Sequence, residues 1–368
     1  MNLYRRILRP LLFRLDAERA HELTLAIGTA GSKLPGVSRL ARTLTYFEDP
    51  RLEVSAAGLR FRNPIGLAAG FDKSGLAIKA LSSIGLGSVE IGSISALPSL
   101  GNPKPRLLRL PHDQAIAVNY GLPNEGSKQI EQRLSIRSRD GESNSLLGIN
   151  LVPTNTFGEC LSTTDSINDL KTSCGRLHPH ADYLNINLSC PNAPQDEEGF
   201  RSTAAIKQLL AEIEELAPNC PVFLKIEPTL DEEYLHGLVS CVKESPSVRG
   251  FQFNLEPGRP EHLELSSAAK HSSVHGAISG RPTAAYNRRC IETLYSIVGN
   301  DYEIIASGGI FSARDAYERI RLGASLLQIY TSLVYEGPSL IKKLKRGLIE
   351  HLNQDGLANI SDARGLGL

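Results

Sequence analysis

The chain has 368 residues and a mass of 40.0 kDa, with 41% hydrophobic and 22% charged residues. This is the composition of a globular protein with enough apolar side chains for a large core. Forty Lys and Arg balance forty Asp and Glu, which excludes the overall basic charge typical of a nucleic-acid-binding protein. The sequence has no apolar run of the ~20 residues that a membrane-spanning helix needs. An arginine-rich start also argues against a secretory signal.

Residues 1–45 form a pattern distinct from the rest. Apolar residues recur at helical spacing from Leu3 to Leu12 with arginines between them, and Pro10 is expected to interrupt or start a helical turn. A second helix is expected over 17–29. A basic amphipathic helix is typical of a membrane-surface contact, but a helix packed on the main domain with solvated arginines fits the pattern equally well. We therefore divide the chain into a helical extension, 1–45, and a main domain, 46–368.

The main domain alternates short apolar runs with helical patterns. Eight runs read as strands: 64–69, 88–92, 146–151, 183–188, 222–226, 250–254, 303–306 and 325–330. Helices are expected over 203–216, 232–242, 312–322 and 340–352, among others. Alternating strands and helices indicate a parallel sheet. Eight such units predict an α/β fold of the (β/α)₈ TIM-barrel type with an N-terminal helical extension, since a doubly wound open sheet usually has fewer strands.

In such a barrel the chemistry gathers at the carboxyl ends of the strands. Lys73 and Lys225 lie at two of these ends, where a lysine supports either an electron-rich cofactor ring or a substrate carboxylate; the alternative is an ion-paired lysine at the surface. Cys190 lies between Asn187 and Asn192 at another. A thiol there can be tuned to act as a base near neutral pH, although most such cysteines are buried apolar side chains.

The ends of the last two strands point to a phosphate. Gly308-Gly309 and Tyr330-Thr331 would present backbone N–H groups and hydroxyls above strands seven and eight, where barrels frequently bind phosphate, and Gly280 adds a further loop. No metal site is expected, because the cysteines form no C-x-x-C pair and the H-x-H of 178–180 lacks ligands at suitable spacing.

Several motifs together resemble the dihydroorotate dehydrogenase family of flavin-dependent barrel enzymes in pyrimidine biosynthesis. They are N-P-I-G-L-A-A-G-F-D-K-S-G (63–75), S-V-E-I-G-S (88–93), G-N-P-K-P-R-L-L-R-L (101–110), N-L-S-C-P-N (187–192), I-S-G-R-P (278–282), S-G-G-I (307–310) and G-A-S-L-L-Q-I-Y (323–330). The segment F-R-L-D-A-E-R-A-H-E (13–22) is similar to the quinone-using, membrane-associated class. This likeness implies dihydroorotate oxidation, with quinone as electron acceptor, at the cytoplasmic face of the cell membrane.

The resemblance also implies roles for particular residues, with Cys190 as the catalytic base. The cofactor FMN would be bound by Ala69, Gly70, Ser93, Asn150, Lys225, Gly280, Gly308, Gly309, Tyr330 and Thr331. The substrate would be bound by Lys73, Asn187, Asn192 and Asn254.

The chain departs from the family pattern in the substrate pocket. Cysteine stands at the base position, where the quinone-using class has serine; Val118 stands where an asparagine is expected, and Leu255 where a threonine is expected. Three hypotheses therefore stay open: dihydroorotate oxidation, the same flavin chemistry on a less polar substrate in specialised metabolism, and a non-catalytic flavin-binding scaffold.

Overall fold

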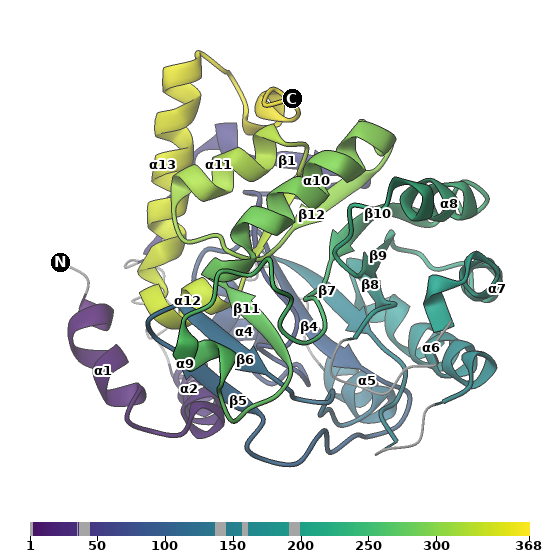
Figure 1. Ribbon diagram of the computed structural model, residues 1–368, viewed down its shortest axis with the longest axis horizontal. Coiled ribbons are helices and arrows are strands. Elements are labelled where there is room, and N and C mark those ends of the chain that lie inside the picture. The colour runs from purple at the N-terminus through teal and green to yellow at the C-terminus, as the bar shows by residue number, and fades with distance from the viewer. Residues whose placement is uncertain (1–2, 35, 37–44, 137–144, 157–160, 191–198) are drawn as a thin grey trace.

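The computed structural model describes residues 3–34, 36, 45–136, 145–156, 161–190 and 199–368. Within these residues, eight parallel strands close into a barrel in the order β10-β12-β13-β3-β4-β7-β8-β9 (Figure 1). The strands are β3 (Ile65–Leu67), β4 (Ser88–Ile94), β7 (Leu146–Leu151), β8 (Tyr183–Asn187), β9 (Val222–Ile226), β10 (Val248–Phe253), β12 (Glu303–Ala306) and β13 (Leu326–Ile329). The predicted TIM barrel and all eight of its strands are confirmed, with strand ends that differ by at most two residues.

The barrel strands are apolar along almost their whole length because they are covered on both faces. Every residue of β8 and β9 is buried, as expected of parallel strands that lie between a filled barrel interior and a layer of helices. The register sets Lys225 of β9 level with Asn187 of β8 and with Gln252 of β10. Polar side chains from three strands therefore meet at one height of the barrel.

Helices cover the outside of the barrel. They are α4 (Ile78–Ser82), α5 (Ser127–Ser135), α6 (Thr163–Leu177), α7 (Thr203–Glu214), α8 (Glu232–Val242), α10 (Ala284–Val298), α11 (Ala313–Arg321) and α13 (Ser339–Asp355). Capping side chains mark where several of these helices begin. Asp231 caps α8 by accepting a hydrogen bond from the Tyr234 N–H at 3.0 Å, and Ser312 and Asp315 form a reciprocal capping box at α11. The four helices predicted by residue range in the main domain are confirmed.

Two antiparallel sheets are additions to the barrel. β1 (Val54–Ala56) pairs with β2 (Leu59–Phe61), and β6 (Ala115–Val118) lies between β5 (Leu107–Leu110) and β11 (Ala277–Gly280). In Figure 1 the second sheet lies beside α2, α9 (Ser267–Lys270) and α12 (Thr331–Glu336). It was not anticipated from the sequence, and it carries Val118 and Gly280 to the open end of the barrel.

The N-terminal residues form a π-helical turn, Tyr4–Leu8, followed by α1 (Arg9–Leu12) and α2 (Ala17–Ser32). Pro10 lies in the first turn of α1, where its missing N–H costs nothing. The segment is held to the barrel by hydrogen bonds from the Tyr4 hydroxyl to the Val334 carbonyl at 2.6 Å and from Arg109 to the Leu12 carbonyl at 2.9 Å. No helix in the described ranges combines the length and apolarity needed to cross a membrane.

Candidate active site

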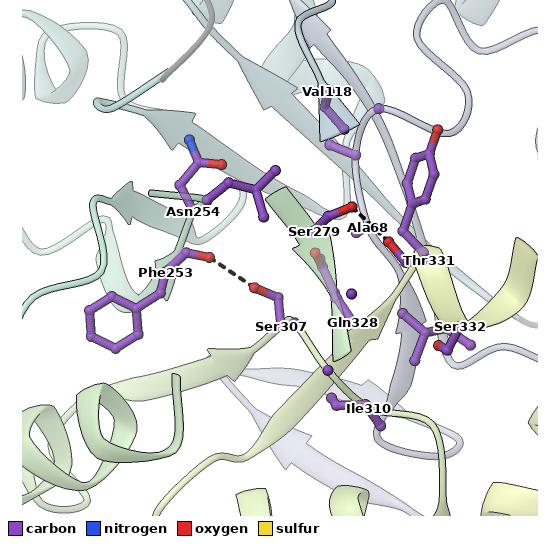
Figure 2. Close-up of a pocket in the computed structure, with 18 of the residues that line it drawn as sticks. Ala68, Val118, Phe253, Asn254, Ser279, Ser307, Ile310, Gln328, Thr331 and Ser332 are labelled. Atoms are coloured by element: carbon purple, nitrogen blue, oxygen red, sulfur yellow. Dashed lines mark hydrogen bonds between the residues drawn. The ribbon is translucent and has the colours of Figure 1, made fainter. Parts of the chain in front are cut away.

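A cavity of about 800 Å³ opens at the carboxyl ends of the barrel strands (Figure 2). Its walls come from the residues that follow β3, β10, β12 and β13, from Lys225 of β9, and from the antiparallel sheet. Figure 2 shows Val118 and Asn254 on one side of this space, and Ser307, Ile310 and Gln328 on another. The barrel thus places its cavity where this fold builds active sites.

One corner of the cavity is made of backbone that only glycine allows. Gly308 and Gly309 have φ angles of +78° and +70°. A Cβ on Gly308 would lie 2.7 Å from the Thr283 hydroxyl, and one on Gly309 would lie 2.5 Å from the Ala284 Cβ. Glycine is required at both positions, and its bare backbone leaves room for close approach of an anion.

The opposite side of that corner offers hydroxyl groups. Ser279 Oγ and Thr331 Oγ1 lie 2.9 Å apart and share a hydrogen bond, visible in Figure 2. Gly280, with φ of +104°, brings the end of β11 so close that an added Cβ would lie 2.8 Å from Thr331 Cγ2. Hydroxyls and exposed backbone around one space form a set of donors suited to a phosphate.

Lys225 lies in the cavity wall with its side chain buried. Among the described residues no carboxylate lies within ion-pair distance of its ammonium group. Burial lowers the pKa of Lys225, whereas the charges of Glu90 and Cys190 act in the opposite direction. A buried ammonium that faces a cavity is suited to an electron-rich ring, as the sequence analysis expected.

A hydrogen-bond network centred on Glu90 fills the barrel beneath the cavity. The Glu90 carboxylate is fully buried and accepts hydrogen bonds from Gln328 at 2.7 Å and from Tyr183 and Asn185 at 3.2 Å each. Gln328 in turn accepts from Gln252 at 2.7 Å. The sequence analysis missed this network, although its signal is present as single polar residues within apolar strands. The charge of this carboxylate opposes the lowering of the Lys225 pKa by burial.

Ser93 and Asn150 join the same network. The Ser93 hydroxyl donates a hydrogen bond to Asn150 Oδ1, and Asn150 Nδ2 donates to Glu90 Oε1 at 3.3 Å. Asn150 is fully buried, and neither residue lines the cavity. Both residues are therefore linked to Glu90, whose charge acts on Lys225.

Cys190 follows β8 in a turn held by two asparagines. Asn254 Nδ2 donates to the Ser189 carbonyl at 2.7 Å and to Asn187 Oδ1 at 3.0 Å. Asn187 Oδ1 also accepts from the Ser189 N–H at 3.2 Å. The Cys190 side chain is buried, with 6% exposed, and its charge acts on Lys225. The turn therefore fixes the thiol close to the lysine at the end of the neighbouring strand.

Lys73 follows β3 and lies against an aromatic ring. Its Nζ is 3.9 Å from the centroid of the Tyr120 ring. Burial lowers the pKa of Lys73 to about 8, with Glu18 opposing the shift and Arg106 adding to it. Tyr120 itself lines the cavity. The sequence analysis gave Lys73 a substrate role but overlooked the tyrosine that supports it.

A second cavity of about 1240 Å³ lies between the N-terminal helices and the barrel. Its walls are mainly apolar, and its polar members include His21 and Arg109. Burial, helped by the charge of Lys73, lowers the pKa of His21 to about 3, so its imidazole is neutral at physiological pH. Tyr330 lines both cavities, and its ring lies 5.3 Å from that of Phe71. The two cavities are thus separated by the Tyr330 side chain.

Most residues singled out by the sequence gather at this site. Nine of the fifteen line the first cavity: Ala69, Gly70, Lys225, Asn254, Gly280, Gly308, Gly309, Tyr330 and Thr331. Four more are joined to them by hydrogen bonds or adjacent chain: Ser93, Asn150, Asn187 and Cys190. Lys73 lies against Tyr120, another wall residue. Asn192 lies outside the described residues.

A closed (β/α)₈ barrel with a glycine-lined cavity and a buried lysine at its strand ends defines a cofactor-binding barrel enzyme. The family model for dihydroorotate dehydrogenase matches residues 51–352. The chain belongs to the dihydroorotate dehydrogenase family, whose members are flavin-dependent oxidoreductases that act on CH–CH groups.

Relatives match along nearly the whole chain. A protein of Acidithiobacillus ferrooxidans named dihydroorotate dehydrogenase (quinone) is 38% identical over 370 residues, which cover 98% of each chain. A protein of the same name from Roseiflexus castenholzii is 35% identical, over 98% of this chain and 96% of its own. The crystal structure of DHODH from Eimeria tenella in complex with ferulenol is 33% identical, covers 95% of both chains and has a TM-score of 0.83.

Proposed function

We propose that this protein oxidises (S)-dihydroorotate to orotate, with FMN as cofactor and a quinone as electron acceptor, in pyrimidine biosynthesis. The observation that carries the proposal is the position of Tyr330 between two cavities of different character. One cavity offers glycine backbone, hydroxyls and a buried lysine; the other is long, mainly apolar and covered by the N-terminal helices. In this reaction dihydroorotate delivers electrons to the flavin and a quinone removes them. Two separate cavities that meet at the flavin suit such a reaction.

The residues around the first cavity fit FMN. Gly308 and Gly309 would bind the phosphate through their backbone, and the Ser279–Thr331 hydroxyl pair lies on the other side of the same space. Lys225 supplies a buried positive charge without a carboxylate at ion-pair distance among the described residues. FMN held there would supply the hydride acceptor for the hydrogen at C6 of the substrate.

Cys190 is the proposed catalytic base. Its sulfur would take the proton from C5 of dihydroorotate while the hydride leaves C6, and the two electrons of the C5–H bond form the C5=C6 double bond of orotate. Asn187 and Asn254 fix the turn that carries the thiol. Lys225 lies on the neighbouring strand, level with Asn187 of the strand that ends before the thiol.

The second cavity is the proposed quinone site. An apolar ring with two carbonyl oxygens suits a space whose wall is mainly apolar and whose polar groups include Arg109 and the neutral His21. Leu3, Ile7 and Leu11, in the segment before α2, are more than half exposed and have arginines between them. We propose that residues 1–45 form an extension that lies on the cytoplasmic face of the cell membrane, and that 46–368 form the FMN barrel.

The proposal is tested by steady-state turnover. Purified holoenzyme is given dihydroorotate with a water-soluble quinone, and orotate formation is followed by its ultraviolet absorbance. We expect quinone-dependent orotate formation. Reduction of quinone without dihydroorotate consumption, or no orotate formed with any quinone, would refute this function.

A second candidate rests on two apolar wall residues. Val118 and Leu255 both line the first cavity in positions where the resemblance implies polar partners for a pyrimidine. Each lost hydrogen-bond partner typically costs ~1–3 kcal/mol. If that cost prevents dihydroorotate from binding, the protein performs the same flavin chemistry on a less polar substrate. Val118→Asn then raises the apparent affinity for dihydroorotate by about tenfold or more; an unchanged KM would remove the argument for this candidate.

A further inference from the structure

A buried arginine lies behind the glycine-lined corner of the first cavity. Arg319 of α11 is 1% exposed and is the largest fully buried side chain among the described residues. Its Nη2 donates hydrogen bonds to the Ala284 carbonyl at 2.9 Å and to the Gly308 carbonyl at 3.3 Å. Gly308 lines the cavity, whereas Arg319 does not. The guanidinium is therefore separated from the cavity by the backbone of the glycine pair.

The positive charge of Arg319 has no counter-charge beside it. Among the described residues no carboxylate lies within ion-pair distance, because Glu318 pairs with Arg288 and Arg314 and Asp315 accepts two backbone N–H groups. The buried Nε of Arg319 has no hydrogen-bond partner in the same part of the chain. Burial lowers the pKa of Arg319 to about 10, and Arg288 adds to the shift, so the side chain stays charged at physiological pH. A buried charge without a partner is costly, and such groups generally have a functional reason.

One peptide group connects this guanidinium to the cavity. The bond between Gly308 and Gly309 is trans, since the cis bonds of the described residues lie elsewhere, and its C=O and N–H therefore point in opposite directions. The carbonyl points back to Arg319, so the Gly309 N–H points away from it, toward the cavity that Gly309 lines. That N–H makes no hydrogen bond to another described residue. A hydrogen bond accepted from a cation polarises the peptide group and makes its N–H a stronger donor.

We propose that Arg319 is a positioning residue for the phosphate of FMN, which it orients and attracts through the peptide group of Gly308 and Gly309 without touching it. A phosphate monoester carries nearly two negative charges at neutral pH, so it supplies the counter-charge that Arg319 lacks. The inference rests on the function proposed above, in which FMN is the cofactor. The alternative is a purely structural arginine that joins α11 to α10 through the Ala284 carbonyl.

The test follows the charge of the bound phosphate. Holoenzyme is titrated from about pH 8 to about pH 5, and the phosphorus NMR resonance of FMN reports protonation, which in a free phosphate monoester occurs near pH ~6. We expect the phosphate to stay dianionic in the wild type. In Arg319→Met it should become protonated within this range, because the charge that favours the dianion is gone. FMN should also bind about tenfold more weakly or worse, measured by the flavin fluorescence that dilution releases.

Two variants make the result specific. Arg319→Lys restores the charge and should restore the dianion and most of the affinity. Arg314→Met removes an arginine of the same helix whose side chain is 81% exposed, and should change neither measurement. Weaker FMN binding in Arg319→Met with the phosphate still dianionic would show a structural role and overturn the proposal. If Arg319→Met does not fold, Arg319→Gln replaces it, since it keeps a donor without charge; a profile equal to that of Arg319→Lys would overturn the proposal.

Failure of this inference and failure of the proposed function are distinguishable. The flavin released from the purified wild type is first identified by chromatography. Absence of FMN would refute the function and the inference together. FMN whose phosphate titrates alike in the wild type and in Arg319→Met would refute the inference alone. A phosphate that responds to Arg319→Met in a protein that forms no orotate would support the inference and refute dihydroorotate as the substrate.

Discussion

Glu18 of the N-terminal helix α2 and Arg106, the residue before β5, form a buried ion pair, with 2.7 Å between Oε1 and the guanidinium and 9% of each side chain exposed. Burial opposes ionisation of Glu18, but the hydrogen bonds and charge of Arg106 outweigh it and lower the pKa of this carboxyl. Arg106 also lies over the ring of Tyr120, a residue of the first cavity wall. The Glu18–Arg106 ion pair therefore connects α2, which lines the second cavity, to the wall of the first cavity.

Breaking this pair should cost stability. Glu18→Gln leaves the Arg106 guanidinium buried without its counter-charge, and removal of one partner from a buried pair typically costs ~3 kcal/mol or more. We expect a lower free energy of unfolding in urea. Glu22→Gln, on the exposed side of the same helix, is the matched control. If Glu18→Gln lowers the free energy of unfolding by less than about 0.5 kcal/mol, the pair contributes no more than an exposed ion pair does.

Replacing the proposed base should separate chemistry from cofactor binding. Cys190→Ala removes the sulfur that takes the C5 proton, so kcat should fall by ~100-fold or more while FMN stays bound. Cys190→Ser keeps an ionisable group and should retain part of the activity, with a pH profile displaced to higher pH. Cysteine residues at 174, 220, 241 and 290 are buried elsewhere and serve as alanine controls. Undiminished turnover in Cys190→Ala would exclude the thiol as base.

Filling the apolar cavity should block only the second half of the reaction. Thr24 lines this cavity from α2 and is exposed, so Thr24→Phe narrows it without displacing core side chains. We expect KM for a long-chain quinone to rise by about tenfold. Reduction of the flavin by dihydroorotate, followed without quinone, should be unchanged. Equal effects on both half-reactions would contradict the separation of the two cavities by Tyr330.

The neutral state of His21 predicts a pH dependence of stability. In the folded protein the pKa of His21 is about 3, whereas an unfolded histidine titrates near its ordinary value of ~6.5. Between these values the unfolded chain binds more protons, so the contribution of His21 to stability is full above pH 6.5 and is lost as pH falls. The loss approaches ~1.4 kcal/mol per pH unit. His21→Phe should show a flatter unfolding profile between pH 4 and 6; identical slopes would mean that His21 is protonated in the folded protein.

The sequence predicts the barrel well because its strands are buried on both faces and therefore appear as continuous apolar runs. The three-stranded sheet of β5, β6 and β11 was missed, since short strands far apart in the chain leave no local signal of their pairing. The glycine-lined corner of the cavity was predicted from glycines 308 and 309, whose positive φ angles other residues adopt only with strain.

The polar interior of the site was harder to foresee. The hydrogen bonds of Glu90 join residues from four strands, and their meeting depends on barrel closure rather than on any spacing in the sequence. Tyr120 was overlooked for the same reason, because its role depends on its distance to Lys73 across the chain. Tyr330 was assigned to FMN alone, whereas it lines both cavities.

The most direct test of the proposed function is an anaerobic titration of the purified, yellow holoenzyme with dihydroorotate, with the flavin absorbance band as the signal. Our account predicts bleaching at near-stoichiometric dihydroorotate, with orotate formed in equal amount and the band restored by added quinone. A flavin that stays oxidised with dihydroorotate, yet is reduced by dithionite, would contradict it and identify a cofactor that serves a different substrate.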